Sequence, residues 1–203
     1  MRSAVLLLLV AVPVLSALPA GLAAQQSAGW SLGLGGAFTT FKGGSYTPAI
    51  DAQTRPHDRM SYDVALSRRG GIWEFSLEAG VAPGHLRVDG APLTLDDRTT
   101  AVDRFRIALL AGRPIARPGS GELLVLAGPV LDGWSPEGGE NHAALGGQAG
   151  LALRIPLGGG LSLENRALVA LTGSPFAAAD IPVGQERKAL WSYAVGAGVR
   201  IRL

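Results

Sequence analysis

The sequence predicts an all-β fold, an eight-stranded antiparallel up-and-down β-barrel with a polar, filled interior. Three observations lead to this prediction. Apolar and polar residues alternate with a period of two from Trp30 onward, which is typical of strands with one apolar and one polar face. Eight segments share this pattern. The connections between them are short and long in turn, as in a meander whose turns lie at opposite ends of the strands.

Composition sets the limits within which this fold is considered. The chain has 203 residues, of which 47% are hydrophobic and 17% are charged, and it contains 29 Gly and no Cys. This length is usual for a single domain, and the apolar content excludes a disordered chain. A net charge of +2 is too balanced for a nucleic-acid-binding protein. The lack of cysteine excludes disulfides, thiolate metal sites and cysteine nucleophiles.

The N-terminus has the pattern of a secretory signal peptide. An arginine precedes an apolar run over residues 4–14, and small residues follow, so that cleavage is expected after Ala23 or Ala24. The alternative is a membrane anchor, but prolines interrupt the segment and a spanning helix needs about 20 apolar residues. We therefore predict a cleaved signal peptide over residues 1–24 and a barrel domain over residues 25–203.

Four strands are predicted in the first half of the chain. They cover residues 30–39, 61–67, 73–81 and 104–111. In each, an aromatic or aliphatic residue alternates with a small or charged one, as in the run Trp73, Glu74, Phe75. This alternation distinguishes a half-buried strand from a helix, in which apolar residues recur every three or four positions.

Four more strands are predicted in the second half. They cover residues 122–134, 145–155, 161–172 and 191–203. The first of these is apolar in both phases, and its length and β-branched residues indicate a strand, with Gly128 and Asp132 marking the polar phase. The last alternates strictly from Trp191 to Leu203.

The connections predict where the ends of the strands lie. The short ones cover residues 68–71, 113–121 and 156–160, and the long ones cover residues 42–59, 82–101, 133–141 and 173–186. In a meander, odd and even connections lie at opposite ends. We therefore expect the tight turns together with both chain termini at one rim and the four long polar loops at the other.

The residues of the polar phase indicate which face is inside. Apolar faces turned inward would make a soluble, lipocalin-like carrier of an apolar ligand, whereas apolar faces turned outward make a transmembrane barrel. The polar phase mixes acidic and basic residues with Gly, Ala and Ser, which suits a narrow filled lumen and favours the outward choice. The ion-pair network predicted inside the lumen consists of Glu74, Glu78, Arg104, Arg106, Arg154, Glu164 and Arg166, and the polar phase also carries Arg200 and Arg202.

Specific pairs within this network follow from strand register. A tight turn centred near Gly159 sets Arg154 against Ser162 or Glu164, and cross-strand neighbours on one face lie about 5 Å apart. The longer loop between the third and fourth strands fixes their register less closely. Counting from the outer rim places Glu78 near Arg104 and Arg106. We predict ion pairs Arg154–Glu164 and Glu78 with Arg104 or Arg106, because a lone charge inside the barrel is costly.

Aromatic residues near the strand ends also favour a membrane-spanning barrel. Two girdles at the bilayer interfaces are typical of such barrels. One predicted girdle consists of Trp30, Trp73 and Phe75, and the other of Phe38, Tyr62, Phe105, Trp191 and Tyr193.

These features together resemble the eight-stranded outer-membrane β-barrel proteins of Gram-negative bacteria, the OmpA/OmpX-like group. The resemblance covers the chain from about Ser27 to Leu203, and its most specific part is the alternating last strand, Trp191–Leu203. It implies a porin-like, monomeric transmembrane barrel in the bacterial outer membrane that contacts outer-membrane lipids, and a last strand read by the barrel-assembly machinery. Such strands usually end in an aromatic residue, and Leu203 departs from that pattern.

The resemblance leaves the function open between three hypotheses. The leading one is a structural or surface-binding and adhesion role through four long outer loops, with an unknown extracellular ligand and no cofactor. The alternative is the soluble carrier. The third is a lipid-modifying barrel enzyme, for which the loop residues His57, His85 and His142 would supply the base, with Ser45 or Ser135 as nucleophile. We expect solvated loop histidines, no catalytic or metal site, and no enzyme activity.

Overall fold

The computed structural model describes residues 29–90 and 94–203, so the predicted signal peptide lies outside the described residues. The described part is built of strands and one short 3₁₀ turn, η2 (Pro48–Ile50). The strands are β1 (Gly29–Thr47), β2 (Ala52–Pro56), β3 (Arg59–Gly70), β4 (Trp73–Ala82), β5 (His85–Gly90), β6 (Thr94–Ala116), β7 (Glu122–Pro136), β8 (His142–Gly158), β9 (Leu161–Thr172) and β10 (Glu186–Arg202).

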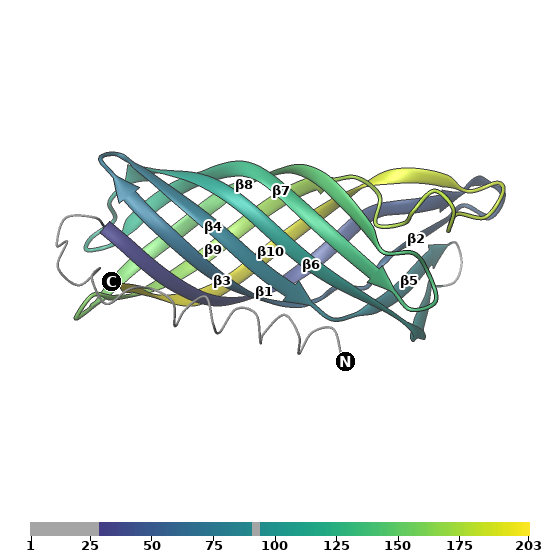
Figure 1. Ribbon diagram of the computed structural model, residues 1–203, viewed down its shortest axis with the longest axis horizontal. Coiled ribbons are helices and arrows are strands. Elements are labelled where there is room, and N and C mark those ends of the chain that lie inside the picture. Colours follow the sequence, from purple (N-terminus) through teal and green to yellow (C-terminus); the bar gives the residue numbers. More distant parts are fainter. Residues whose placement is uncertain (1–28, 91–93) are drawn as a thin grey trace.

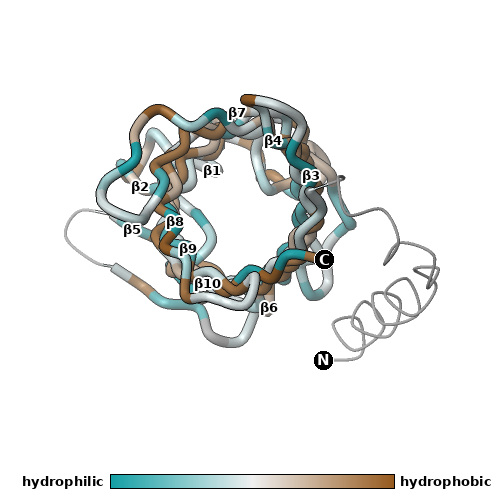
Figure 2. Tube along the Cα trace, turned by 90° about the vertical axis from the view of Figure 1, so that its left-hand side faces the viewer, coloured by the Kyte–Doolittle hydropathy of each residue, from teal (hydrophilic) through white to brown (hydrophobic). Residues whose placement is uncertain are grey.

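Eight of the described strands close into an antiparallel barrel, as the sequence predicts. Their order is β1-β3-β4-β6-β7-β8-β9-β10, and β10 pairs with β1 from Arg202 opposite Ser31 to Glu186 opposite Tyr46. Figure 1 shows the strands tilted against the long axis, and Figure 2 looks along that axis at the closed ring. Closure pairs the backbone groups of the first and last strands, which a barrel in lipid requires.

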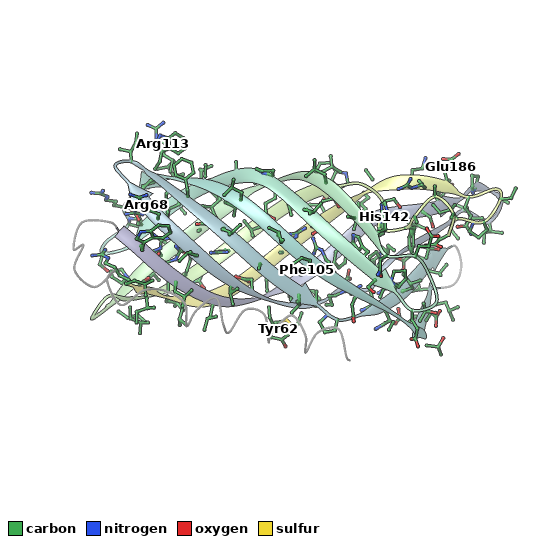
Figure 3. The ribbon with its side chains drawn as sticks, viewed as in Figure 1. Tyr62, Arg68, Phe105, Arg113, His142 and Glu186 are labelled. Atoms are coloured by element: carbon green, nitrogen blue, oxygen red, sulfur yellow. The ribbon has the colours of Figure 1, made fainter. Side chains whose placement is uncertain are left out.

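The two ends of the barrel differ as the connections predict. The tight turns after β3, β6 and β8 lie at the end where Arg202 pairs with β1, and Gly71 takes a φ of 61° in the first of them. Arg68 and Arg113 lie at this end in Figure 3, whereas His142 and Glu186 lie at the opposite end. We refer to these as the turn end and the loop end.

Two of the predicted long loops contain strands that the sequence analysis did not identify. At the loop end, β3 and β4 stop, and β2 and β5 take their place in the sheet between β1 and β6. Thr54 lies opposite Ser45 and Val88, and Val88 lies opposite Leu95. We call β2, β5 and the ends of β1 and β6 that pair with them the crown. These segments lack a long apolar alternation, so backbone pairing with the longer strands holds them in place.

The apolar faces of the strands point outward. Leu77 and Leu109 are 54% and 52% exposed, and Leu151 is exposed on β8. The charged residues of the opposite phase, among them Glu74 and Glu164, are buried inside the ring. This is the reverse of a soluble ligand carrier, whose apolar side chains would line the interior, so that alternative is wrong.

The interior is charged on one side and apolar on the other. Apolar residues of β6, β7, β8 and β9 form one buried cluster, made of Ala108, Leu110, Leu124, Leu126, Val130, Ala152 and Ala170. β7 is apolar in both phases because Leu124 and Leu126 fill the lumen while Val125 faces outward. Alternation alone did not predict this apolar half of the interior.

Candidate functional site

A buried carboxylate, Glu164 on β9, lies at the centre of the charged half of the lumen. It accepts hydrogen bonds from Arg154 at 2.7 and 3.0 Å, from Arg166 at 2.5 Å and from Arg200 at 3.2 Å. Arg154 lies directly opposite Glu164 in the β8–β9 register, so the predicted pair is present in the structure. Three guanidinium groups therefore share one carboxylate.

The network crosses the lumen from this centre. Arg154 donates two hydrogen bonds to Glu74 on β4, at 2.8 and 2.9 Å, and Arg200 donates to the same carboxylate at 2.9 Å. Nearer the turn end, Arg69 bonds Glu122 at 2.5 and 3.1 Å. Because these pairs join strands on opposite sides of the ring, they close the lumen above the turn end.

The predicted pairing of Glu78 with Arg104 or Arg106 is wrong. Glu78 accepts a hydrogen bond from Arg166 at 2.8 Å, whereas Arg104 and Arg106 both bond Asp132 on β7, at 2.7 Å each. In the β4–β6 register Glu78 lies opposite Ala108, and in the β6–β7 register Arg106 lies opposite Asp132.

The predicted ion pairs did not include Arg69 and Glu122, which pair across the barrel, or Asp132, which pairs with the neighbouring strand β6. The sequence marks Asp132 as a polar-phase residue of its strand, because apolar residues flank it. That position could have placed Asp132 among the predicted lumen ion pairs. Arg69 and Glu122 lie beside tight turns, where a charged residue is commonly solvent-exposed. Only the closed ring brings these two residues together.

The lumen keeps a small cavity of about 80 Å³ beside the network. Its walls include Gly35, Asp63, Glu78, Arg166 and Gly198. A water molecule takes about 30 Å³ of liquid volume, so this space suits a few water molecules rather than a solute. A wider space of about 990 Å³, lined by Arg69, Glu122 and Arg154 among others, lies at the turn end, so side chains fill the middle of the barrel rather than its whole length.

An apolar cluster closes the lumen toward the loop end. Phe41, Val102, Trp134 and Leu190 are each at most 4% exposed and pack together. The guanidinium of Arg104 lies 5.4 Å from the ring centres of both Phe41 and Trp134, a distance at which cation–π attraction operates. The charged network therefore has a lid of aromatic and aliphatic side chains.

A buried arginine, Arg59, joins the barrel to the crown. Its guanidinium donates to the backbone oxygens of Ala82 at 3.1 Å and Val102 at 2.6 Å, and its Nε donates to that of His57 at 3.0 Å. These oxygens lie where β4 ends, on β6, and between β2 and β3. One side chain thus satisfies backbone acceptors at the level where β2 and β5 replace β3 and β4 in the sheet.

The predicted aromatic girdles lie on the outside of the barrel. Phe38, Tyr62, Trp73, Phe75, Trp191 and Tyr193 are between 41% and 56% exposed, and Trp30 and Phe105 are partly exposed. Near the turn end, the guanidinium of Arg68 lies 5.5 Å from the Trp30 ring centre and that of Arg113 lies 5.9 Å from Trp73. Exposed leucines such as Leu77 lie between the two girdles.

The crown carries its own ion pairs. Arg55 bonds Asp58 and Asp89, each at 2.7 Å, and Arg87 bonds Asp89 at 2.7 Å. Burial raises the pKa of Asp89, but the hydrogen bonds from Arg87 and Arg55 outweigh it, and the pKa lies below its usual value.

The histidines do not form the arrangement that the enzyme hypothesis requires. His57 and His85 lie together in the crown, whereas His142 contacts Arg187 at 3.4 Å. Ser45 donates to Gln185 at 3.4 Å and Ser135 donates to Asn141 at 2.8 Å, rather than to an imidazole. Nucleophilic catalysis needs the base within hydrogen-bond reach of the nucleophile, which these pairs do not provide.

Comparison with known proteins yields structural matches only. No protein-family model and no curated protein sequence matches the chain. Neisserial surface protein A matches with a TM-score of 0.57 and 12% identity over 86% of this chain and 97% of its own. The outer-membrane protein OprG of Pseudomonas aeruginosa matches with a TM-score of 0.57 and 13% identity, over 87% and 97%. A major outer-membrane protein of Thermus thermophilus matches with a TM-score of 0.55 and 12% identity, over 88% and 100%.

These matches extend over nearly the whole length of each solved protein, and they agree with the closed ring and the outward apolar faces. Among the residues that the structure describes, no helix is long and apolar enough to cross a membrane. The closed ring and the structural matches together show that the chain has the fold of the eight-stranded outer-membrane β-barrel proteins of the OmpA/OmpX-like group.

Proposed function

We propose that this protein is an integral barrel of a bacterial outer membrane that binds a partner outside the cell through its loop end. The observation that carries the proposal is the crown, a paired extension of the wall beyond the outer girdle. In Figure 3, Tyr62 and Phe105 of that girdle lie well short of the end where His142 and Glu186 lie.

Strand lengths support this placement in the membrane. A tilted strand of about 9–11 residues crosses a bilayer, and β4 has 10 residues, from Trp73 in one girdle to the level of Tyr62 in the other. β6 has 23 residues and β10 has 17, so each extends beyond the membrane. At the loop end these extensions carry the long connections, and the antiparallel pairing of β2 with β5 stiffens two of them.

The interior supports binding rather than transport as the role. The ion-pair network and the apolar lid close the lumen, and the cavity beside them suits only a few water molecules. The protein would therefore contact other molecules through its outer surfaces. Lipids would contact the apolar band, and the barrel-assembly machinery would recognise the alternating β10 during insertion, with the protein acting as a monomer and needing no cofactor.

Loop replacement in intact cells tests the proposed binding. Residues 137–140 and 177–184, which join β7 to β8 and β9 to β10, are replaced by Gly-Ser segments of equal length. Cells that carry the parent protein should adhere more strongly than cells without it to at least one of immobilised fibronectin, laminin and heparin. The loop replacements should abolish this increase in adhesion. Heat-modifiable migration in gels confirms a folded barrel. Adhesion equal to that of cells without the protein on all three surfaces contradicts surface binding and leaves a structural role.

We also propose that the protein has no catalytic role. The combined replacement of His57, His85 and His142 by Gln should leave the lipid A species of expressing cells unchanged in mass spectra. A lipid A modification that depends on the parent protein and disappears in this variant would contradict the proposal.

A further inference from the structure

The crown brings together three side chains of a type that binds metal ions. His57 follows β2, His85 begins β5 and Asp96 lies on β6, and one ligand atom from each lies within 4.8 Å of the others. Figure 1 shows the three strands side by side at the loop end. Because these residues are far apart in the sequence, their spacing gave no metal-binding motif.

The backbone holds the two histidines in place. The N–H of His57 donates to the carbonyl oxygen of His85 at 2.9 Å, and the imidazole rings stack with centres 4.3 Å apart. Arg59 donates to both of these residues' carbonyl oxygens, at 3.0 and 3.5 Å. The pair is therefore fixed to the wall of the barrel and is not free in a solvated loop.

A hydrogen bond sets the tautomer of His57. Its Nδ1 lies 2.6 Å from the carbonyl oxygen of Asp58, which can only accept, so Nδ1 carries the proton of the neutral ring. Nε2 then presents its lone pair, 3.7 Å from a carboxylate oxygen of Asp96. Metal-binding histidines are commonly oriented in this way by a backbone carbonyl.

The charged residues around Asp96 leave its carboxylate available to bind a metal ion. The Nε of Arg87 lies 4.0 Å from a carboxylate oxygen of Asp96, but that Nε donates to Asp89 at 2.7 Å. Arg55 is likewise bound to Asp58 and Asp89. Arg55 and Arg87, the two crown arginines whose side chains the structure describes, are thus both bound to Asp89, and Asp96 faces His57.

We propose that His57, His85 and Asp96 bind a divalent transition-metal ion, with Zn²⁺ the best match. Two imidazoles and a carboxylate suit zinc, whereas Ca²⁺ and Mg²⁺ prefer oxygen ligands alone. Bonds of about 2.0–2.1 Å in a tetrahedral site place ligand atoms about 3.3 Å apart. The His57 Nε2–Asp96 separation is 3.7 Å and all three ligand atoms lie within 4.8 Å, so binding requires rotation of the side chains, including the stacked His57 and His85 rings. The partly exposed position leaves the fourth site to water or to a carboxylate of a bound partner. The ion would join β5 and β6 to the β2–β3 connection.

Titration of the purified full chain in detergent micelles tests the site. Calorimetry with Zn²⁺ at neutral pH should show one equivalent bound, and Co²⁺ should give the visible absorption of a four-coordinate complex. His57→Gln, His85→Gln and Asp96→Asn should each weaken binding at least 10-fold. His142→Gln is the matched control, because this loop histidine lies outside the cluster, and it should bind as the parent does.

A second measurement needs no variant and so does not depend on variant folding. In the NMR spectrum of the parent protein, Zn²⁺ should shift the imidazole nitrogen signals of His57 and His85 and leave those of His142 in place. The proposal is overturned if no saturable one-equivalent binding is seen, if His142→Gln weakens it as much as His57→Gln, or if the His142 signals shift instead. These outcomes are independent of cell adhesion, so they do not decide the proposed surface binding.

Discussion

At the scale of single residues, Glu164 shows how the lumen tolerates buried charge. Its carboxylate accepts hydrogen bonds from Arg154, Arg166 and Arg200, and those arginines also bond Glu74 or Glu78. Buried ions are stable only when each has partners, because removing one partner leaves an uncompensated charge. The acids and bases around Glu164 therefore form one connected network, and Arg104, Arg106 and Asp132 form a second group.

Replacement of Glu164 by Leu should destabilise the barrel, since it leaves three guanidinium groups short of a partner. The expected loss in free energy of unfolding is about 3–5 kcal/mol, measured by urea titration of the protein in lipid vesicles. The control is Glu186→Leu, the same change at an exposed pair with Lys188, which should cost less than about 1 kcal/mol. Equal effects of the two changes would show that the network does not stabilise the barrel.

In the crown, the bulge of β6 that follows Asp97 should depend on pH. Hydrogen bonds from the side chains of Thr99 and Thr100 lower the pKa of Asp97 from 3.8 to about 2. A lowered pKa means that these bonds stabilise the bulge fully above the unfolded value and are lost as pH falls toward about 2. The carboxyl carbon signal of Asp97 in an NMR titration should have its midpoint near pH 2. Thr99→Val combined with Thr100→Val should move it upward, and an unchanged midpoint would refute the assigned cause.

At the scale of elements, the strands show which features the alternation specifies. Leu77, Leu109 and Leu151 all point outward, as their phase predicts. The alternation did not identify β2 or β5, because short polar strands hold their place through backbone pairing with β1 and β6. Nor did it identify the inward Leu124 and Leu126, because both phases of β7 are apolar.

The cost of a charge on the outer face should depend on its position along the barrel. Leu77 lies midway along β4 between Trp73 and Val81, the latter opposite Tyr62 and Phe105 of the outer girdle. Leu77→Arg should cost about 2–4 kcal/mol in free energy of unfolding in lipid vesicles, the range found at a bilayer midplane.

The matched change is Ile115→Arg, at an equally exposed residue near the turn end. It should cost about 1 kcal/mol or less, because an arginine there reaches the interface. If both variants lost the same stability, the band between the girdles would not be the part in contact with the hydrocarbon.

At the scale of the whole molecule, the barrel is longer than a bilayer requires and its extra length lies at the loop end. This arrangement predicts an orientation, because the tight turns should face the periplasm and the crown should face outward. The chain has no cysteine, so any introduced thiol is unique.

Thiol labelling of intact cells with a membrane-impermeant reagent tests this orientation. Lys42→Cys and Val183→Cys, both at exposed positions, should react, as should cysteines placed within residues 85–95 and 176–186. Arg68→Cys should react only after the cells are broken. Reaction of Arg68→Cys in intact cells would reverse the orientation.

The closed lumen predicts that the purified monomer conducts weakly or not at all. The charged network and the apolar lid lie between the two ends of the barrel, so hydrated ions find no continuous path. Recordings in planar bilayers should show no sustained large conductance. A large and stable conductance would mean that the network opens in the membrane.

The sequence by itself determined the all-β class, the eight barrel strands, the outward apolar faces and the ends at which short and long connections lie. Each of these depends on local period or connection length, which neighbouring residues specify. Even the Arg154–Glu164 pair is local, since a tight turn sets its register. Only the tertiary structure decided that Glu78 pairs with Arg166, that Asp132 binds two arginines, and that His57, His85 and Asp96 meet. Glu78 and Arg166 lie on strands that only the closed ring brings face to face. The contacts of Asp132 and of the His57, His85 and Asp96 cluster join neighbouring strands, and they depend on register and side-chain direction, which alternation alone does not specify.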